Sequence, residues 1–366
     1  MNKSATTESV AILYQADTPP AKNRIIKPMK PGGYSDSGAD IGFALKQAGI
    51  DVITPVDLPD VERDLDWVFP DTRKGIADAR ARGATILWLN TVLFAGHPVE
   101  DVINNGMAIV GQVPRVADIY DDKLVTNELL RSNHVPIPES VLIHANDVAS
   151  MSVPFIFPVV IKPVRGRGSQ GVVVVRNAAD LPNVLNELFA EQRYGDAIYM
   201  EPYLPGEEIT ITVMPPGNYI LNGKECIYEK YWSLPPVKRF NHQDGVAPYN
   251  GVVAVINNSR VLNEYELETD PIKSVCRQCE RAAYLVHAKA PVRIDCRADA
   301  TGTFFLFDLN MKPNMTGASR PNRIGQDSLT ALAARKIGWS FTDLLLNMFR
   351  QRWTLHKSTD TDTFVL

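Results

Sequence analysis

Short apolar runs alternate with helical stretches in the first third of the chain. Four runs of strand length lie at residues 10–14, 51–55, 84–89 and 107–110. Residues 39–48 have the spacing of a helix, and Gly49 follows in the position of a helix C-cap. Strands that alternate with helices favour a mainly parallel sheet with helices on both faces. We therefore predict an α/β domain over residues 1–117.

After residue 117 the pattern favours α+β structure. Residues 118–204 contain predicted helices at 123–132 and 180–189 and predicted strands at 158–162, 172–176 and 198–203. Residues 205–353 contain a strand at 208–214, a long loop at 232–249, a helix at 271–287, a hairpin of 291–297 with 303–310, and helices at 329–337 and 341–353. We predict two subdomains with these limits and a frayed polar tail over residues 354–366.

Composition excludes several classes of protein. The 366 residues are 45% hydrophobic with a formal net charge of −4, which does not favour nucleic-acid binding. No apolar stretch reaches the ~18 residues of a membrane span, and no secretory signal is expected. Cys276 and Cys279 form a C-x-x-C pair in a predicted helix, without a partner pair at zinc-site spacing. We expect structural thiols and a cytoplasmic setting, and a redox or metal role is the alternative.

Residues 166–171 read G-x-G-x-x-G, a pattern that binds phosphates in several folds. A dinucleotide-binding fold requires a helix directly after the loop, but VVVV follows and favours a strand. A glycine loop between two strands can lay backbone N–H groups over phosphates. Lys162, in the preceding strand, is placed to neutralise phosphate charge. The chain has no H-R-D or D-F-G, which excludes a protein kinase, and an ordinary hairpin is the simpler alternative.

Two further strands combine carboxylates with an arginine. Because strand side chains alternate between faces, Arg293 and Asp295 share a face, as do Asp308 and Asn310 on the returning strand. Carboxylate and amide oxygens suit Mg²⁺ that carries nucleotide phosphates. A solvated polar face with an ion pair is the alternative. The opposite face is predicted to enter a core through Phe305, Phe307 and Leu309.

The order of these segments resembles the ATP-grasp superfamily and, within it, the D-alanine–D-alanine ligase group. DKLVTNELLRSNHVPIPES resembles the family's Asp-Lys helix, FPVVIKPVRGRGSQGV its lysine and glycine loop, and YMEPYLPGEEITITV its adenine-binding hinge. IYEKYWS resembles its second lysine, and VRID with DLNMKPNMTGAS its metal strands. The resemblance covers residues 122–338 and implies an ATP-grasp fold behind an N-terminal parallel-sheet (pre-ATP-grasp) domain.

The resemblance also implies a role for individual residues, with ATP and Mg²⁺ (or Mn²⁺) as cofactors. The phosphates of ATP would contact Lys123, Lys162, Gly166, Gly168, Ser169 and Gly171. The adenine would lie along Glu201 and Leu204, and the ribose would bind Glu208. Lys230 would reach the transferred phosphate, and Arg293 would stabilise charge at the acyl centre. The metal ligands would be Asp295, Asp308 and Asn310, and the substrate side would include Tyr231, Ser319 and Arg320.

The implied reaction joins a carboxylate to an amine through an acyl-phosphate and releases ADP and phosphate. The expected partners are therefore two small molecules, and relatives commonly form homodimers. Two alternatives remain open. One is another ATP-grasp reaction, either acyl transfer to a thiol or phosphorylation of a small molecule. The other is a nucleotide-binding regulator without catalysis.

The departures from the family pattern fall on the substrate side. Asp308 stands where the family usually has Glu, Gly168 replaces a Ser, and Asn314 replaces a Gly. An N-terminal loop is basic, with Lys22, Arg24, Lys27 and Lys30. We expect the same reaction class with substrates other than two D-alanines. Ser319 with Arg320 or Arg323 is predicted to bind an acidic group of the amine substrate, and surface arginines paired with acids such as Asp327 are the alternative.

Overall fold

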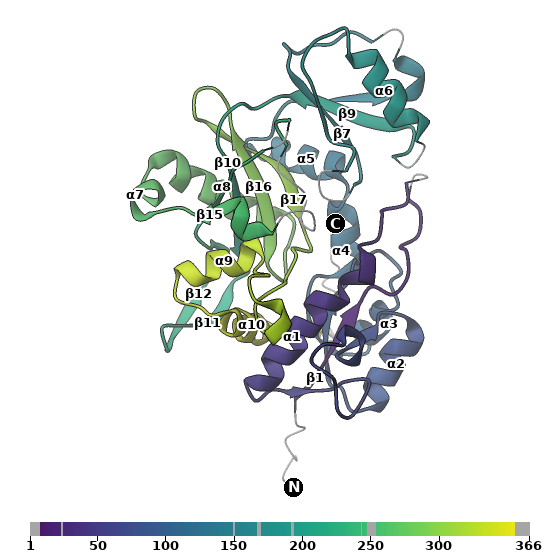
Figure 1. The fold of residues 1–366 in the computed structure, drawn as a ribbon, viewed down its shortest axis with the longest axis vertical. Coiled ribbons are helices and arrows are strands. Elements are labelled where there is room, and N and C mark those ends of the chain that lie inside the picture. The colour runs from purple at the N-terminus through teal and green to yellow at the C-terminus, as the bar shows by residue number, and fades with distance from the viewer. Residues whose placement is uncertain are drawn as a thin grey trace, which may run out of the picture.

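The computed structural model describes residues 8–22, 25–148, 151–166, 170–191, 194–242, 244–246 and 254–355. The chain forms an N-terminal α/β lobe, a small β-sheet lobe at the top of Figure 1, and a large antiparallel sheet with its helices. Gly168, Ser169, Arg24, part of the 232–249 segment and the tail from 356 lie outside the described residues. No helix in the described ranges is long and apolar enough to cross a membrane.

The N-terminal sheet is parallel and is covered on both faces, as predicted. Its strands are β1 (Ser9–Tyr14), β2 (Asp51–Val52), β3 (Val68–Pro70), β4 (Ile86–Asn90) and β5 (Ala108–Val110), and its helices are α1 (Ser35–Gln47), α2 (Arg73–Ala81) and α3 (Val99–Asn104). Val10 and Ile12 of β1 join the core cluster that contains α1 side chains. Ala11 and Leu13 join the cluster that contains α2 and α3 side chains. Both faces of β1 are therefore buried, which explains its continuous apolar sequence.

A second sheet of four antiparallel strands forms the small lobe. Its order is β6 (Val141–His144), β9 (Ala197–Pro202), β7 (Val159–Pro163) and β8 (Val173–Val175), with α6 (Leu181–Ala190) against it. Helices α4 (Pro114–Tyr120) and α5 (Lys123–Ser132) precede this sheet. β7 and β8 pair antiparallel across the glycine segment. The predicted strand–loop–strand arrangement is therefore confirmed, and a dinucleotide-binding loop is excluded.

The large sheet has the order β15-β14-β10-β16-β17, and β13 also pairs with β10. Its strands are β10 (Glu208–Met214), β13 (Trp232–Ser233), β14 (Val237–Arg239), β15 (Ser259–Val261), β16 (Val292–Ala298) and β17 (Phe304–Asn310). A separate hairpin consists of β11 (Gly217–Leu221) and β12 (Lys224–Tyr228). The helices of this part are α7 (Glu264–Leu267), α8 (Asp270–Leu285), α9 (Leu329–Lys336) and α10 (Phe341–Arg350). Short 3₁₀ turns lie at Pro31–Tyr34, Asp64–Asp66, Ala145–Asp147, Val255–Asn257 and Pro321–Arg323.

The prediction of one long loop at 232–249 is wrong in its first part, because β13 and β14 both pair with β10. Strands of two or three residues are too short to show a hydrophobic period, so only their pairing in the folded sheet defines them.

The two cysteines of the C-x-x-C pattern do not form a bonded pair with each other. Cys279 of α8 meets Cys296 of β16 with 3.5 Å between the sulfur atoms, and all four cysteines are free thiols.

A β-bulge corrects the predicted faces of β17. Asp295 pairs with Asp308, but Cys296 pairs with Leu306, so Phe307 is an extra residue in the ladder. The bulge places Leu306 in the core beside Cys296. Phe307 lines the cavity described below, and Phe305 lies opposite Arg297. The prediction that Phe305 and Phe307 enter the core is therefore wrong, whereas Leu309 does pack against it.

A buried arginine joins the C-terminal loop to the N-terminal lobe. Arg320 is 1% exposed, and its Nε donates to Asp40 Oδ1 of α1 at 2.9 Å. Its other nitrogens donate to the carbonyl oxygens of Val61 and Asp36 and contact Asp64. Ser319 Oγ donates to the Asp40 carbonyl oxygen at 2.9 Å. These contacts give Ser319 and Arg320 a structural role at this interface, and their predicted role in substrate binding stays a prediction.

Arg320→Leu is expected to destabilise the protein strongly, because it leaves the Asp40 carboxylate buried without this guanidinium. Breaking a buried ion pair costs about 3–5 kcal/mol in unfolding free energy. Arg260→Leu is the matched control, because Arg260 is exposed and pairs only locally with Glu266, where the loss should stay below about 1 kcal/mol. Urea unfolding measures both, and equal losses would contradict a structural role for Arg320.

Candidate active site

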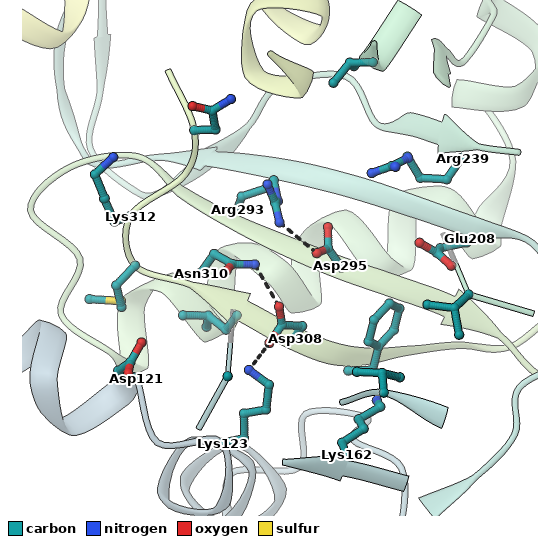
Figure 2. A pocket seen from close by; sticks show the side chains of 18 of the residues that line it. Asp121, Lys123, Lys162, Glu208, Arg239, Arg293, Asp295, Asp308, Asn310 and Lys312 are labelled. Carbon is teal, nitrogen blue, oxygen red and sulfur yellow. Dashed lines mark hydrogen bonds and ion pairs between the residues drawn. The ribbon is translucent and has the colours of Figure 1, made fainter. Parts of the chain in front are cut away.

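One cavity of about 580 Å³ lies where the three parts of the molecule meet (Figure 2). Strands β7 and β9 of the small lobe form one wall, and β10, β14, β16 and β17 form the floor. The start of α1 and the loop before it contribute from the N-terminal lobe. The structure brings together ten of the predicted site residues there, namely Lys123, Lys162, Gly166, Glu201, Leu204, Glu208, Arg293, Asp295, Asp308 and Asn310.

Two carboxylates face each other at the centre of the cavity floor. Asp295 of β16 and Asp308 of β17 are paired in the strand register. Thr210 Oγ1 donates to Asp295 Oδ1 at 2.7 Å, and Asn310 Nδ2 donates to Asp308 Oδ2 at 2.9 Å. Lys123 Nζ lies 2.7 Å from Asp308 Oδ1. Thr210 of the neighbouring strand β10 thus orients Asp295, whereas Asp308 is held by Asn310 of its own strand and by Lys123 at the start of α5.

The charges around Asp308 keep it ionised. Burial raises the pKa of this carboxyl group, but the positive charges of Lys123 and Arg293 outweigh burial and lower it to about 2. Within the described residues no group of three or more His, Cys, Asp or Glu side chains is placed to hold a metal ion. The two carboxylates and the Asn310 amide fit a divalent cation only if other oxygen atoms, such as those of a phosphate, complete its coordination.

Arg293 is a charged group at the substrate side of these carboxylates. Its NH2 group lies 3.1 Å from Asp295 Oδ2. Burial lowers the pKa of the guanidinium, but Asp295 and Asp308 outweigh burial and raise it. The same balance holds for Lys123, where the charge of Asp308 overcomes burial and raises the pKa of the ammonium. Both cations therefore persist in the cavity and can stabilise negative charge.

A buried ion pair marks the wall formed by the small lobe. Lys162 of β7 pairs with Glu201 of β9, and both side chains are less than 10% exposed. Burial raises the pKa of Glu201 and outweighs the charge of Lys162. The Lys162 ammonium also lies 4.7 Å from the centroid of the Phe307 ring, which the bulge turned into the cavity. The bulge therefore contributes directly to the position of this lysine.

Glu208, at the start of β10, is held by two basic side chains. His242 Nε2 lies 2.8 Å from Glu208 Oε2, and Arg297 NH1 lies 3.6 Å from the same oxygen. Arg297 also donates to the Gly245 carbonyl oxygen at 2.6 Å. Glu208 is opposite Arg239 in the pairing of β10 with β14. Glu208, Gly245 and Arg297 line the part of the cavity that the adenine and ribose were predicted to occupy.

Arg239 is the main residue that sequence reasoning missed. It is buried, it lines the cavity, and burial lowers its pKa despite the opposing charges of Asp295 and Glu208. Lys230, predicted to reach the transferred phosphate, is exposed after β12 and lies outside the cavity lining. No periodic signal was available in the sequence, because Val237, Lys238 and Arg239 read apolar–basic–basic over only three residues.

Three other predicted residues also lie away from the cavity. Tyr231 donates its hydroxyl group to the Ala288 carbonyl oxygen at 2.9 Å, and burial raises its pKa to about 12. Gly171 packs against Tyr194 and Pro163 and does not line the cavity. Ser319 is bound to α1, as described above, but Arg323 does line the cavity and contacts Asp36 and Asp40 at 3.3 Å.

Comparison with known proteins agrees with this geometry. The family model described as "D-ala D-ala ligase C-terminus" matches residues 133–350. A D-alanine–D-alanine ligase of Francisella tularensis subsp. novicida is 23% identical over 231 residues, which are 63% of this chain and 67% of that protein. One from Synechococcus sp. is 25% identical over 333 residues, which are 87% of this chain and 90% of that protein. Further Francisella relatives match over 59% of their own length.

A solved structure has the same fold. The D-alanine–D-alanine ligase of Bacillus anthracis, crystallised with ATP, aligns with a TM-score of 0.60 and 16% sequence identity. The alignment covers 94% of this chain and 96% of that one. The ATP-grasp fold with its N-terminal parallel sheet is therefore confirmed.

Lys162→Met is expected to destabilise the protein by about 3–5 kcal/mol, because it leaves Glu201 buried without its cation. The folded-state pKa of Glu201, already raised, should rise further. The loss relative to the wild type should therefore grow as the pH rises through the raised folded-state pKa of Glu201, where the wild-type carboxyl group ionises beside its lysine. The double variant Lys162→Met/Glu201→Gln removes the buried charge and should recover most of the loss at neutral pH. Urea unfolding across pH tests this, and a pH-independent loss would contradict it.

Proposed function

The chain belongs to the D-ala D-ala ligase C-terminus family, whose ATP-grasp ligases use ATP with Mg²⁺ to form a carbon–nitrogen bond, and on this premise we propose its reaction. It joins a carboxylate to an amine through an acyl-phosphate and releases ADP and phosphate. The substrates are small amino-acid-like molecules other than two D-alanines.

This proposal rests on two paired carboxylates that lie beside two cations. Asp295 and Asp308 lie beside Lys123 and Arg293, and all four line one cavity. Phosphoryl transfer needs negative charge to be neutralised on several oxygen atoms at once, and this cluster supplies the groups for it. A regulatory protein that only binds a nucleotide would not require a charged arginine beside the carboxylates that hold the metal.

The residues divide the work in the following way. Mg²⁺ held by Asp295, Asp308 and Asn310 would neutralise phosphate charge and polarise the transferred group. Lys123 and Lys162 donate to the phosphate oxygens of ATP, and Arg239 takes the place assigned from the sequence to Lys230. Glu201, Leu204 and Glu208 bind the adenosine, and Gly166, Gly168 and Ser169 belong to the loop that covers the phosphates.

Activation is necessary because a carboxylate would have to expel oxide to acylate an amine. Transfer of the terminal phosphoryl group to the carboxylate oxygen provides a phosphate leaving group instead. The amine then forms a bond to the acyl carbon, the carbon–oxygen bond to phosphate breaks, and Arg293 stabilises the negative oxygen of the tetrahedral state. The acyl-phosphate hydrolyses readily, so enclosure of the cavity protects it from water.

The difference in substrate is supported by side chains at the end of the cavity nearest the N-terminal lobe. Lys312, Asn314 and Arg323 line this end, together with Lys27 and Lys30 of the basic loop. Lys30 and Arg323 both contact Asp36, and Lys27 contacts Asp121. A cavity end lined by this many charged side chains favours substrates with a polar side chain over alanine, whose side chain is a methyl group.

The remaining assignments are part of the same proposal. The subdomain limits are 117/118 and 204/205, with the last subdomain ending at 353. A homodimer and a cytoplasmic setting are proposed as well, the latter on the four free thiols.

Activity is expected to require Mg²⁺ or Mn²⁺, and Asp295→Asn should lower ADP release about a hundredfold or more. Asp299→Asn, in the turn of the same hairpin, is the matched control and should leave turnover unchanged. ADP release is measured with carboxylate and amine present, with and without EDTA. Full activity in EDTA, or in Asp295→Asn, would disprove the metal assignment.

Arg239→Met is expected to lower turnover about a hundredfold, because it removes a buried cation from the phosphate side of the cavity. Lys230→Met, which removes a cation of the same charge outside the cavity, should change turnover less than about twofold, since surface substitutions act weakly. Steady-state ADP release compares the two variants. The reverse order of effects would restore Lys230 to the mechanism and remove Arg239.

A further inference from the structure

Arg165 lies between the end of β7 and Gly166, which lines the cavity. Its side chain is 7% exposed, and arginines are rarely buried to this extent unless they are paired. Its NH2 group donates to the carbonyl oxygen of Asp118 in α4 at 2.8 Å. Arg165 is not part of the cavity lining that the structure describes, so its guanidinium acts on the site through other residues.

Three carboxylates surround this guanidinium. They belong to residues 118–122, at the end of α4 and before α5, which we call the acidic junction. NH2 lies 3.5 Å from Asp118 Oδ1, NH1 lies 3.5 Å from Asp121 Oδ2, and Nε lies 3.6 Å from Asp122 Oδ2. Asp122 is also the N-cap of α5, where its Oδ1 accepts from two backbone N–H groups of the first turn. One side chain therefore both starts α5 and contacts Arg165.

The N-terminal lobe holds the acidic junction from the other side. Lys22 Nζ lies 3.1 Å from Asp118 Oδ2, and Lys27 pairs with Asp121. Burial raises the pKa of Asp121, but Lys27 and two other cations, Arg165 among them, outweigh burial and lower it. In Figure 1, α4 and α5 accordingly lie between the small lobe and the N-terminal lobe. The acidic junction is thus bound by cations from both lobes.

A backbone hydrogen bond shows what this docking positions. The N–H of Lys123, the first residue of α5, donates to the Val164 carbonyl oxygen at 3.3 Å. The first N–H groups of a helix have no partner within the helix, so this bond joins the start of α5 to the end of β7. Lys123 and Gly166 both line the cavity. The contacts of Arg165 therefore set where Gly166 lies relative to Lys123.

We propose that Arg165 is a positioning residue for the nucleotide, because it fastens the end of β7 to the acidic junction and so presents Gly166 and Lys123 to the ATP phosphates in one fixed geometry. This rests on the proposed function, in which those two residues contact the phosphates. Lys22 and Lys27 hold the junction on the N-terminal lobe, so three parts of the chain set this geometry together. An arginine suits the task because its planar guanidinium presents donors along several edges.

The first test compares a ligand that has phosphates with one that has none. Isothermal titration calorimetry measures the Kd of the non-hydrolysable analogue AMP-PNP with Mg²⁺, and that of adenosine. Arg165→Met should raise the Kd of AMP-PNP about ten- to a hundredfold and change that of adenosine less than about twofold. Arg165→Lys keeps the charge but reaches fewer carboxylates, and it should raise the Kd of AMP-PNP only about three- to tenfold. Arg176→Met, at an exposed position after β8 in the same lobe, is the matched control and should bind like the wild type.

The second test follows the docking itself. Hydrogen exchange at the Lys123 amide reports the bond to Val164 without any ligand. Arg165→Met should speed this exchange at least about tenfold, while the amides of β10 and β16 keep their protection. AMP-PNP with Mg²⁺ should slow the exchange in the wild type.

The outcomes separate this inference from the proposed function. An equal loss of affinity for AMP-PNP and adenosine, or unchanged exchange at Lys123, overturns the role of Arg165 and leaves the ligase function in place. If Arg165→Met does not fold, Arg165→Lys gives the same comparison, and an unchanged ratio of the two Kd values overturns the role as well. Failure of the wild type to bind AMP-PNP with Mg²⁺ overturns the nucleotide assignments of the proposed function itself.

Discussion

The antiparallel pairing of β16 with β17, together with its single bulge, is the constraint on which the site depends. It sets Asp295 opposite Asp308, so that two carboxylates of one hairpin face the same cavity. Beyond the bulge it turns Leu306 into the core and Phe307 into the cavity, under the ammonium of Lys162. A slip of β17 by one residue in this register would turn Asp308 toward the apolar interior, where burial of charge is prohibitive.

The cations and carboxylates that line the cavity also compensate one another's charge. Lys123 contacts Asp308, Arg293 contacts Asp295, and Lys162 contacts Glu201. Each of the three carboxylates thus has a cation beside it, so none of them is a buried charge without compensation. Asp295 and Asp308 would hold the metal in the proposed reaction, and Lys123 and Lys162 would bind the phosphates.

The N-terminal lobe takes part in the cavity because the C-terminal loop is fastened to it. Arg320 and Ser319 bind α1 through Asp40, and α10 packs against the same helix in Figure 1. The end of the described chain returns to the N-terminal sheet, where Trp353 and Ile109 exchange two backbone hydrogen bonds. These contacts bring Tyr34 and Asn90 against the loop after β17. This end of the cavity therefore has a wall formed by both lobes.

Sequence alone was enough to predict the parallel N-terminal sheet, the strand–loop–strand around the glycines, and ten residues that line the cavity. Those features depend on local hydrophobic periodicity and on short motifs. Both can be recognised along the sequence without knowledge of the fold. Three features could be seen only in the folded chain: Arg239 rather than Lys230 lines the cavity, Phe307 rather than Leu306 faces it, and Arg320 is buried. Each of these depends on strand pairing or on contacts between residues up to 284 positions apart, such as Arg320 with Asp36. No local pattern in the sequence identifies a contact partner at that separation, because the partner depends on how the surfaces of whole helices and strands pack in the folded chain.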